Sequence, residues 1–241
     1  TSGTLTDKQR TLGWIGFWTM TTGTTAAAVM VLLNEASVLY TFYAPLQAHW
    51  IFYVGMALVV VGSWIGGAGL IMKYMEWRKA NPKQPSPLLT FMVIVNLTMW
   101  IICSLGVAVE VVFQLIPWSL GWVDKIDVLL SRTLFWYFGH PLVYFWLLPA
   151  YMVWYVIIPK IIGGKIYSDA LARLSFMLFL IFSIPVGFHH QLTEPGIDSF
   201  WKYLQVVLTM MVVIPSLLTA FSMFSAFFYS FRNPAFLNGV T

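Results

Sequence analysis

Three histidines and one tyrosine in this sequence have the types and spacing of a metal site with a phenol beside it. His140 and Tyr144 lie four residues apart in the stretch FGHPLVYFW, which puts both side chains on one face of a helix. His189 and His190 are adjacent in the stretch SIPVGFHHQ. Three neutral imidazoles without a thiolate or carboxylate suit copper or zinc. A phenol next to a metal-bound imidazole can supply a proton and, if it is oxidised, an electron.

The composition places these residues inside a membrane protein. The 241 residues are 59% hydrophobic and 9% charged, with a mean hydropathy of +0.80, whereas a soluble domain carries roughly 25% charged residues. The single cysteine, Cys103, excludes an internal disulfide and a cysteine-based metal cluster. Six stretches reach the ~20 apolar residues that a helix needs to cross the hydrocarbon core: about 12–33, 50–72, 88–115, 130–158, 171–190 and 201–231. We therefore predict an all-α, polytopic bundle of six transmembrane helices, forming a single transmembrane domain over residues 1–241.

The positions of the histidines within these spans bring them to a similar depth. His140 is about ten residues into the fourth span, or ~15 Å at helical rise, and the adjacent histidine pair comes at the end of the fifth. Neighbouring side chains of a regular helix point ~100° apart, but Pro185 disturbs the helix and Gly187 relaxes it, so the pair can converge. The alternative is that the pair is a polar helix end, His140 bonds a backbone carbonyl and Tyr144 is a core tyrosine.

The basic residues predict the orientation of the chain. With the N-terminus in the cytoplasm, ten of the thirteen Lys and Arg residues fall on the cytoplasmic side, as the positive-inside rule requires: Lys8, Arg10, Lys73, Arg78, Lys79, Lys83, Lys160, Lys165, Arg173 and Arg232. The other side holds Lys125, Arg132 and Lys202. Both ends of this segment are therefore expected in the cytoplasm. The net charge of +4 belongs to loops and does not indicate a nucleic-acid partner.

Beyond the histidines, longer stretches of the chain resemble subunit I of the haem–copper oxygen reductases. The stretches that carry the resemblance are WYFGHPLVYFWLLPAY (136–151), PVGFHHQLTEPGID (185–198) and ASVLYTFYAPLQAH (36–49). The chain most resembles the B type, the cytochrome c oxidases of the ba kind, because Leu142 stands where other branches have an acidic residue of a second proton path.

This resemblance implies a function for each of the residues above. It implies that His140, His189 and His190 bind the copper ion called CuB. It implies that Tyr144 is covalently cross-linked to His140 and supplies an electron and a proton when the O–O bond breaks, while Trp136 lines the oxygen-reduction pocket. The implied enzyme is a respiratory terminal oxidase of a plasma membrane that reduces O2 to water and translocates protons.

The same resemblance implies a high-spin and a low-spin haem, whose axial ligands are histidines on other spans. No histidine precedes His49 or follows His190, so we expect those ligands to lie outside this chain. The family has at least twelve spans, and the six here correspond to its third to eighth helices. The expected partners are O2, membrane lipid, a subunit II carrying a copper electron-entry site, and cytochrome c or a similar electron donor.

Hydroxyl side chains on the fourth and sixth spans predict a route for protons from the cytoplasm to Tyr144. Tyr151 and Tyr155 follow Tyr144 at +7 and +11, the repeat of one helix face. Ser216 and Thr219 lie in the inner half of the sixth span. The B branch of the family has matching residues in such a channel, whereas ordinary hydrogen bonding between helices is the alternative interpretation.

Glu110 is the one acidic residue well inside a predicted span. A charged side chain is costly in lipid. Because Glu110 lies near the end of the third span, its carboxylate could reach the membrane interface.

Two other functions fit part of this pattern. Nitric oxide reductases are related enzymes, but they typically use iron in place of copper and lack the tyrosine, so Tyr144 argues against them. A non-enzymatic six-span module for metal binding or transport would need no haem ligands, but it does not explain a resemblance that extends through the motifs.

Overall fold

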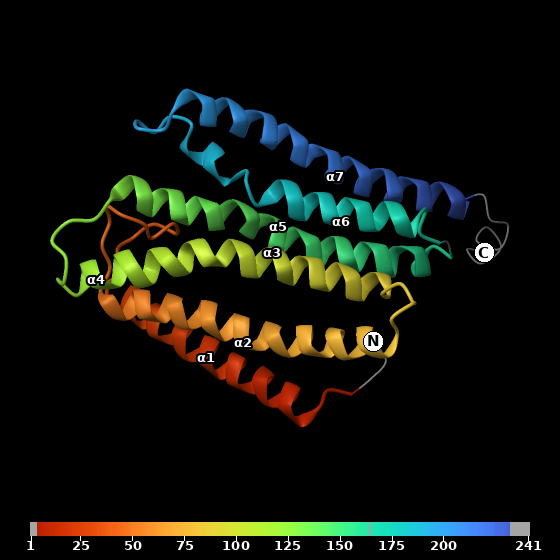
Figure 1. Cartoon of the computed structure of the whole chain (residues 1–241), viewed down its shortest axis with the longest axis horizontal. Helices are drawn as coiled ribbons and strands as arrows, with labels where there is room; N and C mark the ends of the chain where they lie inside the picture. The colour runs from red at the N-terminus through yellow and green to blue at the C-terminus, as the bar shows by residue number, and fades with distance from the viewer. Residues whose placement is uncertain (1–3, 164, 232–241) are drawn as a thin grey trace. The chain divides into compact units, whose positions relative to one another are not determined.

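The computed structural model describes residues 4–163 and 165–231, and every regular element in this part of the chain is helical (Figure 1). Within it, six helical runs are long and apolar enough to cross a membrane: Asp7–Leu32, Trp50–Ala80, Leu88–Ser119, Val128–Ile161, Asp169–Gln191 and Ser199–Phe228. The predicted all-α class and the six predicted spans are confirmed. Arg232, which entered the predicted charge balance, lies outside the described residues.

The first two helices extend beyond their apolar stretches. α1 (Asp7–Leu32) begins early because Thr6 and Gln9 form a capping box, in which the Gln9 N–H donates to Thr6 Oγ1 at 3.3 Å and the Thr6 N–H to Gln9 Oε1 at 3.1 Å. In the extended end of α2 (Trp50–Ala80), Glu76 Oε1 accepts a 2.7 Å hydrogen bond from Nε2 of the buried Gln9. A helix satisfies its own backbone, so it need not end where its apolar residues end.

The chain divides into two compact units. The first unit comprises Thr1–Gln84, Ile101–Gly139 and Thr193–Gly196, and the second comprises Pro85–Trp100, His140–Leu192 and Ile197–Thr241. α3 (Leu88–Glu110) and α5 (Val128–Ile161) contribute residues to both units. α3 continues directly into the π-helix η1 (Val111–Leu115) and the short helix α4 (Ile116–Ser119).

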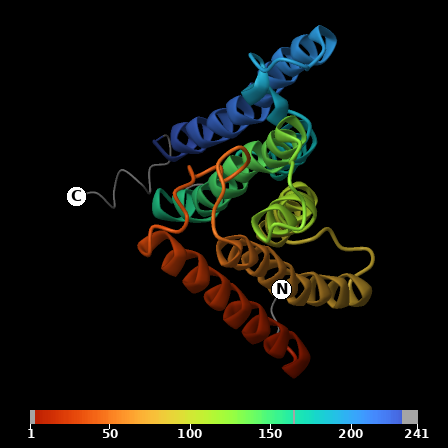
Figure 2. The ribbon, with the colours of Figure 1, turned by 90° about the vertical axis from the view of Figure 1, so that its left-hand side faces the viewer.

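In the first unit, α1 and α2 lie side by side (Figure 2), and glycines bring their backbones close. A Cβ on Gly16 would lie 2.6 Å from the Gly62 carbonyl oxygen, and one on Gly23 would lie 2.4 Å from the Gly55 oxygen. Small residues permit such close packing of membrane helices, where van der Waals contact replaces the hydrophobic driving force that operates in water.

In the second unit, α6 (Asp169–Ser183) and α7 (Ser199–Phe231) lie side by side and pack with segments of α3 and α5. The core that they share is rich in methionine and phenylalanine. Its buried members are Met92, Val95, Met99, Leu148, Met152, Tyr155, Ala172, Phe176, Phe179, Val186, Val212 and Met223.

A proline in α5 leaves a backbone carbonyl for another helix to satisfy. Pro149 has no N–H, so the Phe145 oxygen one turn earlier lacks its usual helical donor. Nδ2 of the buried Asn96, on α3, donates to that oxygen at 3.3 Å. This bond holds the turn of α5 that also carries Tyr144.

Large apolar side chains are exposed along the outer helices of both units. Trp14 and Trp18 on α1, and Phe224 and Phe228 on α7, are examples. Such surfaces promote aggregation in water but suit contact with lipid or with other membrane helices. Together with the six apolar spans, they identify a multi-pass membrane protein.

Candidate metal centre

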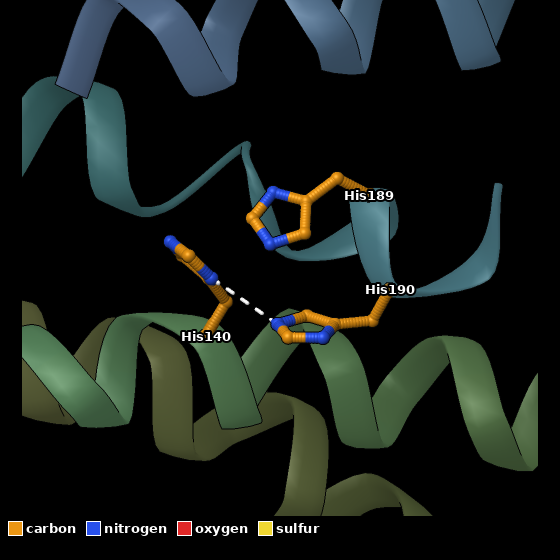
Figure 3. Close-up of side chains that lie close together, drawn as sticks. All are labelled: His140, His189 and His190. Carbon is orange, nitrogen blue, oxygen red and sulfur yellow. Dashed lines mark hydrogen bonds between the residues drawn. The ribbon is translucent and has the colours of Figure 1, made fainter. Parts of the chain in front are cut away.

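His140, His189 and His190 come together in the second unit, as their positions in the spans predict (Figure 3). His140 projects from α5, and the other two project from η2, a 3-10 helix. The ring centroids lie 4.3 Å apart for His140 and His189, 5.4 Å for His140 and His190, and 4.4 Å for His189 and His190. One ring nitrogen from each residue lies within 4.8 Å of the others.

The irregular end of α6 allows the two adjacent histidines to face His140. α6 ends at Ser183, just before Pro185, and the chain resumes as η2 (Gly187–Gln191). Nε2 of the buried Gln205, on α7, donates to the Pro185 carbonyl at 2.9 Å and ties this turn in place. The predicted interruption of the helix by the proline and the glycine is therefore confirmed.

The spacing of two of the ring nitrogens fits a shared metal ion. His140 Nδ1 and His190 Nε2 are 3.2 Å apart. Two neutral imidazoles at this distance share a proton in a hydrogen bond. The same separation suits two ligands of one ion, because nitrogens bound at ~2.0 Å with tetrahedral angles lie ~3.3 Å apart. With only imidazoles in the cluster, the donor set favours copper or zinc.

Thr209 fixes the tautomer of His189. Its Oγ1 donates its only hydrogen to the Gln205 carbonyl at 2.7 Å, so at 2.9 Å from His189 Nδ1 it can only accept. Nδ1 of His189 therefore carries the proton, and Nε2 keeps the lone pair that a metal requires. Sequence reasoning missed Thr209, because a threonine that bonds its own helix carries no local sign of a histidine partner.

Tyr144 lies beside His140, one helical turn further along α5. The two ring centroids are 4.9 Å apart with an interplanar angle of 61°. His140 Nε2 is buried and has no hydrogen-bond partner among the described residues. His140 therefore presents Nδ1 to His190 and keeps Nε2 unengaged by the described residues.

The four hydroxyl residues of the predicted proton route do not form one continuous chain of hydrogen bonds in the described part of the structure. The Tyr151 phenol hydrogen-bonds the Ser216 side chain. The Tyr155 hydroxyl itself is buried and has no hydrogen-bond partner in the described part of the chain. Thr219 Oγ1 lies 2.8 Å from Oγ of Ser175 on α6. Ser175, which sequence reasoning did not single out, is thus a further buried hydroxyl next to the series.

Trp136 belongs to the first unit, whereas the histidines belong to the second. Its ring packs edge-on against Tyr43, with centroids 6.4 Å apart, and against Phe135 at 5.2 Å. Its place in an oxygen-reduction pocket stays a prediction.

Comparison with known proteins gives consistent matches along the chain. A family model described as "Cytochrome C and Quinol oxidase polypeptide I" matches residues 2–238. The chain is 50% identical over 211 residues to cytochrome c oxidase subunit 1 of Thermus thermophilus, covering 88% of this chain and 38% of that protein. It is 37% identical over 70 residues to quinol oxidase subunit 1 of Sulfolobus acidocaldarius, covering 29% of this chain and 14% of that protein.

The fold of the chain also matches that of a solved structure. A cryo-EM structure of a heme-copper terminal oxidase dimer matches with a TM-score of 0.89 and 49% identity, covering 92% of this chain and 39% of that one. The chain thus spans less than two fifths of the length of the Thermus protein and of this structural relative.

Proposed function

The chain belongs to the cytochrome c and quinol oxidase polypeptide I family, and we propose that it is the central part of the catalytic subunit of a respiratory terminal oxidase. In this proposal the enzyme reduces O2 to water and translocates protons, and the six spans are the third to eighth helices of the subunit. The observation that carries the proposal is the cluster of three histidines with Tyr144 one turn from His140.

His140, His189 and His190 would hold the copper ion CuB, since three imidazoles form a donor set that copper accepts. Bound copper would supply an electron at the place where O2 is reduced. The chain orients the three rings for this purpose: Thr209 holds His189 in the tautomer with a free Nε2.

We propose that Tyr144 is cross-linked to His140 through the histidine Nε2. That nitrogen is buried and unengaged by any described residue, and the His140 and Tyr144 ring centroids are 4.9 Å apart. Forming the C–N bond removes one hydrogen from the nitrogen and one from a ring carbon, and O2, the proposed substrate, accepts the two electrons and two protons. The Tyr144 hydroxyl keeps its own proton and can donate it, with an electron, during O–O cleavage.

The haems and the electron donor would come from outside this chain. High-spin and low-spin haems need axial histidines, and the sequence has none before His49 or after His190. We propose that further helices of the subunit supply them. Electrons would enter through a copper-bearing subunit II from cytochrome c or a similar donor. Leu142 supports the B type, and with it a plasma membrane. The charge balance supports both ends of the segment lying in the cytoplasm.

Protons for water formation would reach Tyr144 through the hydroxyl series. The hydrogen bond between Tyr151 and Ser216 supports the part of the route nearest Tyr144. Tyr155 and Thr219 would continue it, with water joining groups that do not contact directly.

The two alternative functions are not favoured. A nitric oxide reductase relative would not be expected to place a tyrosine at position 144 beside the metal ligand. A six-span module for metal binding or transport would not be expected to match an oxidase family model over residues 2–238.

Copper content tests the proposal. The assembled membrane protein is purified as wild type, as His190→Ala and as His49→Asn. His49 lies outside the cluster and caps α2 through its Nδ1, a role that asparagine can keep. We expect His190→Ala to lose one copper ion per protein while retaining its haems, and His49→Asn to match the wild type. Equal copper content in all three proteins would refute the assignment.

A further inference from the structure

Glu110 is a carboxyl group enclosed in the first unit, at the junction of α3 and η1. Its exposed fraction is 0%, so it does not reach the interface as its position near the end of a span suggested. No Lys or Arg in the described part of the chain forms an ion pair with it. An isolated carboxylate is very costly to bury, so the neutral acid is the favoured form.

The hydrogen bonds around Glu110 decide which of its oxygens carries the proton. Ser131 Oγ donates to Glu110 Oε1 at 2.7 Å. The same hydroxyl accepts from the Ala44 N–H at 3.2 Å, which leaves its hydrogen free for the carboxyl. Oε1 is therefore the accepting oxygen, and the acid proton lies on Oε2. Ser131 and Ala44 are both fully buried, so this arrangement is enclosed on that side.

Glu110 Oε2 and the side-chain amide of Gln114 are buried polar groups without hydrogen-bond partners among the described residues. The atoms concerned are Glu110 Oε2, Gln114 Oε1 and Gln114 Nε2. The nearby Tyr53 interacts electrostatically with Glu110, but its hydroxyl already accepts from the Ala48 N–H and donates to the Leu46 carbonyl. Buried polar atoms are normally paired, with ordered water when no protein group serves.

The four-residue spacing of Glu110 and Gln114 puts the two side chains on one side of the helix. Glu110 directly precedes η1 and Gln114 lies within it. Single π-helical turns within α-helices occur frequently at functional sites. The three unpaired atoms together offer one donor from the acid, donors from the amide and an accepting oxygen, which matches the two to four partners that a buried water needs.

We propose that Glu110 and Gln114 form an internal water-binding site in which Glu110 is a hydrated, proton-holding carboxylic acid. The ligand is water, bound between Glu110 Oε2 and the Gln114 amide. The site lies entirely within the first unit and does not depend on the metal centre or on the oxidase proposal.

Infrared spectroscopy of the assembled protein in lipid tests this site. Spectra are recorded for the wild type, Glu110→Gln, Gln114→Leu and the control Glu35→Gln, which makes the same substitution at an exposed glutamate. We expect Glu110→Gln to remove one carboxylic-acid C=O band and Glu35→Gln to remove none. The band should shift on transfer to D2O within the mixing time, and it should move in Gln114→Leu.

Each result decides the proposal. Loss of the band in Glu110→Gln, together with prompt exchange and a shift in Gln114→Leu, supports it. If Glu110→Gln removes no acid band, Glu110 is ionised and the proposal fails. If the band neither exchanges promptly nor moves in Gln114→Leu, the acid is dry and the water site is refuted. If Glu110→Gln does not fold, the Gln114→Leu and D2O measurements still test the water site, because both leave Glu110 intact.

Discussion

Thr209→Val should weaken copper binding by removing the hydrogen-bond acceptor of His189 Nδ1. Valine has nearly the shape of threonine, so the change deletes the 2.9 Å contact with little loss of packing. His189 then loses its preference for the tautomer with a free Nε2. Partners of this kind typically contribute 10–100-fold to metal affinity.

The structure places the effect at the lower end of that range. The lost bond is single, joins neutral groups and is only partly buried, so its net worth is at most about 1.5 kcal/mol. A difference of 1.4 kcal/mol is tenfold in an equilibrium constant. We therefore expect copper to bind about tenfold more weakly in Thr209→Val.

The assay titrates the reduced, assembled protein with a copper(I) chelator and follows copper retained at the centre. Thr98→Val is the matched control, because Thr98 also donates to its own helix, to the Ile94 carbonyl at 2.8 Å, and has no histidine partner in the described part of the chain. The control should follow the wild type. If Thr209→Val retains copper as well as the control does, Thr209 does not orient the ligand and the reasoning is wrong.

Two further substitutions test the packing and the proton route. Gly16→Ala places a Cβ 2.6 Å from the Gly62 oxygen and should destabilise the protein by about 1–3 kcal/mol in denaturant unfolding; Gly13→Ala meets nothing within 4 Å and should not. Ser216→Ala removes the partner of the Tyr151 phenol and should slow O2 consumption on the order of tenfold. Ser222→Ala is its control, since Ser222 bonds only its own helix among the contacts described; equal slowing by both would remove Ser216 from the route.

The spans were predictable because membrane thickness imposes a length that apolar composition reveals directly. The ends of α1 and α2 were not, since they depend on the Thr6–Gln9 capping box and on the contact of Gln9 with Glu76. That contact joins residues far apart in the sequence, and hydropathy carries no information about it.

The histidine cluster was predictable because depth along a span follows from residue number, and Pro185 marks the interruption that turns the pair inward. Thr209 and Ser175 were missed because their partners depend on how α7 is rotated against η2 and α6. The burial of Glu110 was missed for a similar reason: Ser131 and the Ala44 backbone cover it.

The mass of one tryptic peptide tests the central claim most directly. Trypsin cuts after Arg132 and Lys160 and releases residues 133–160, which contain both His140 and Tyr144. From the native, assembled protein, the account predicts a mass two hydrogen atoms below the sequence value, with no fragment ions from cleavage between the two residues. An unmodified mass would contradict it, because the imidazole and the phenol would then be separate side chains and not one oxygen-reducing cofactor.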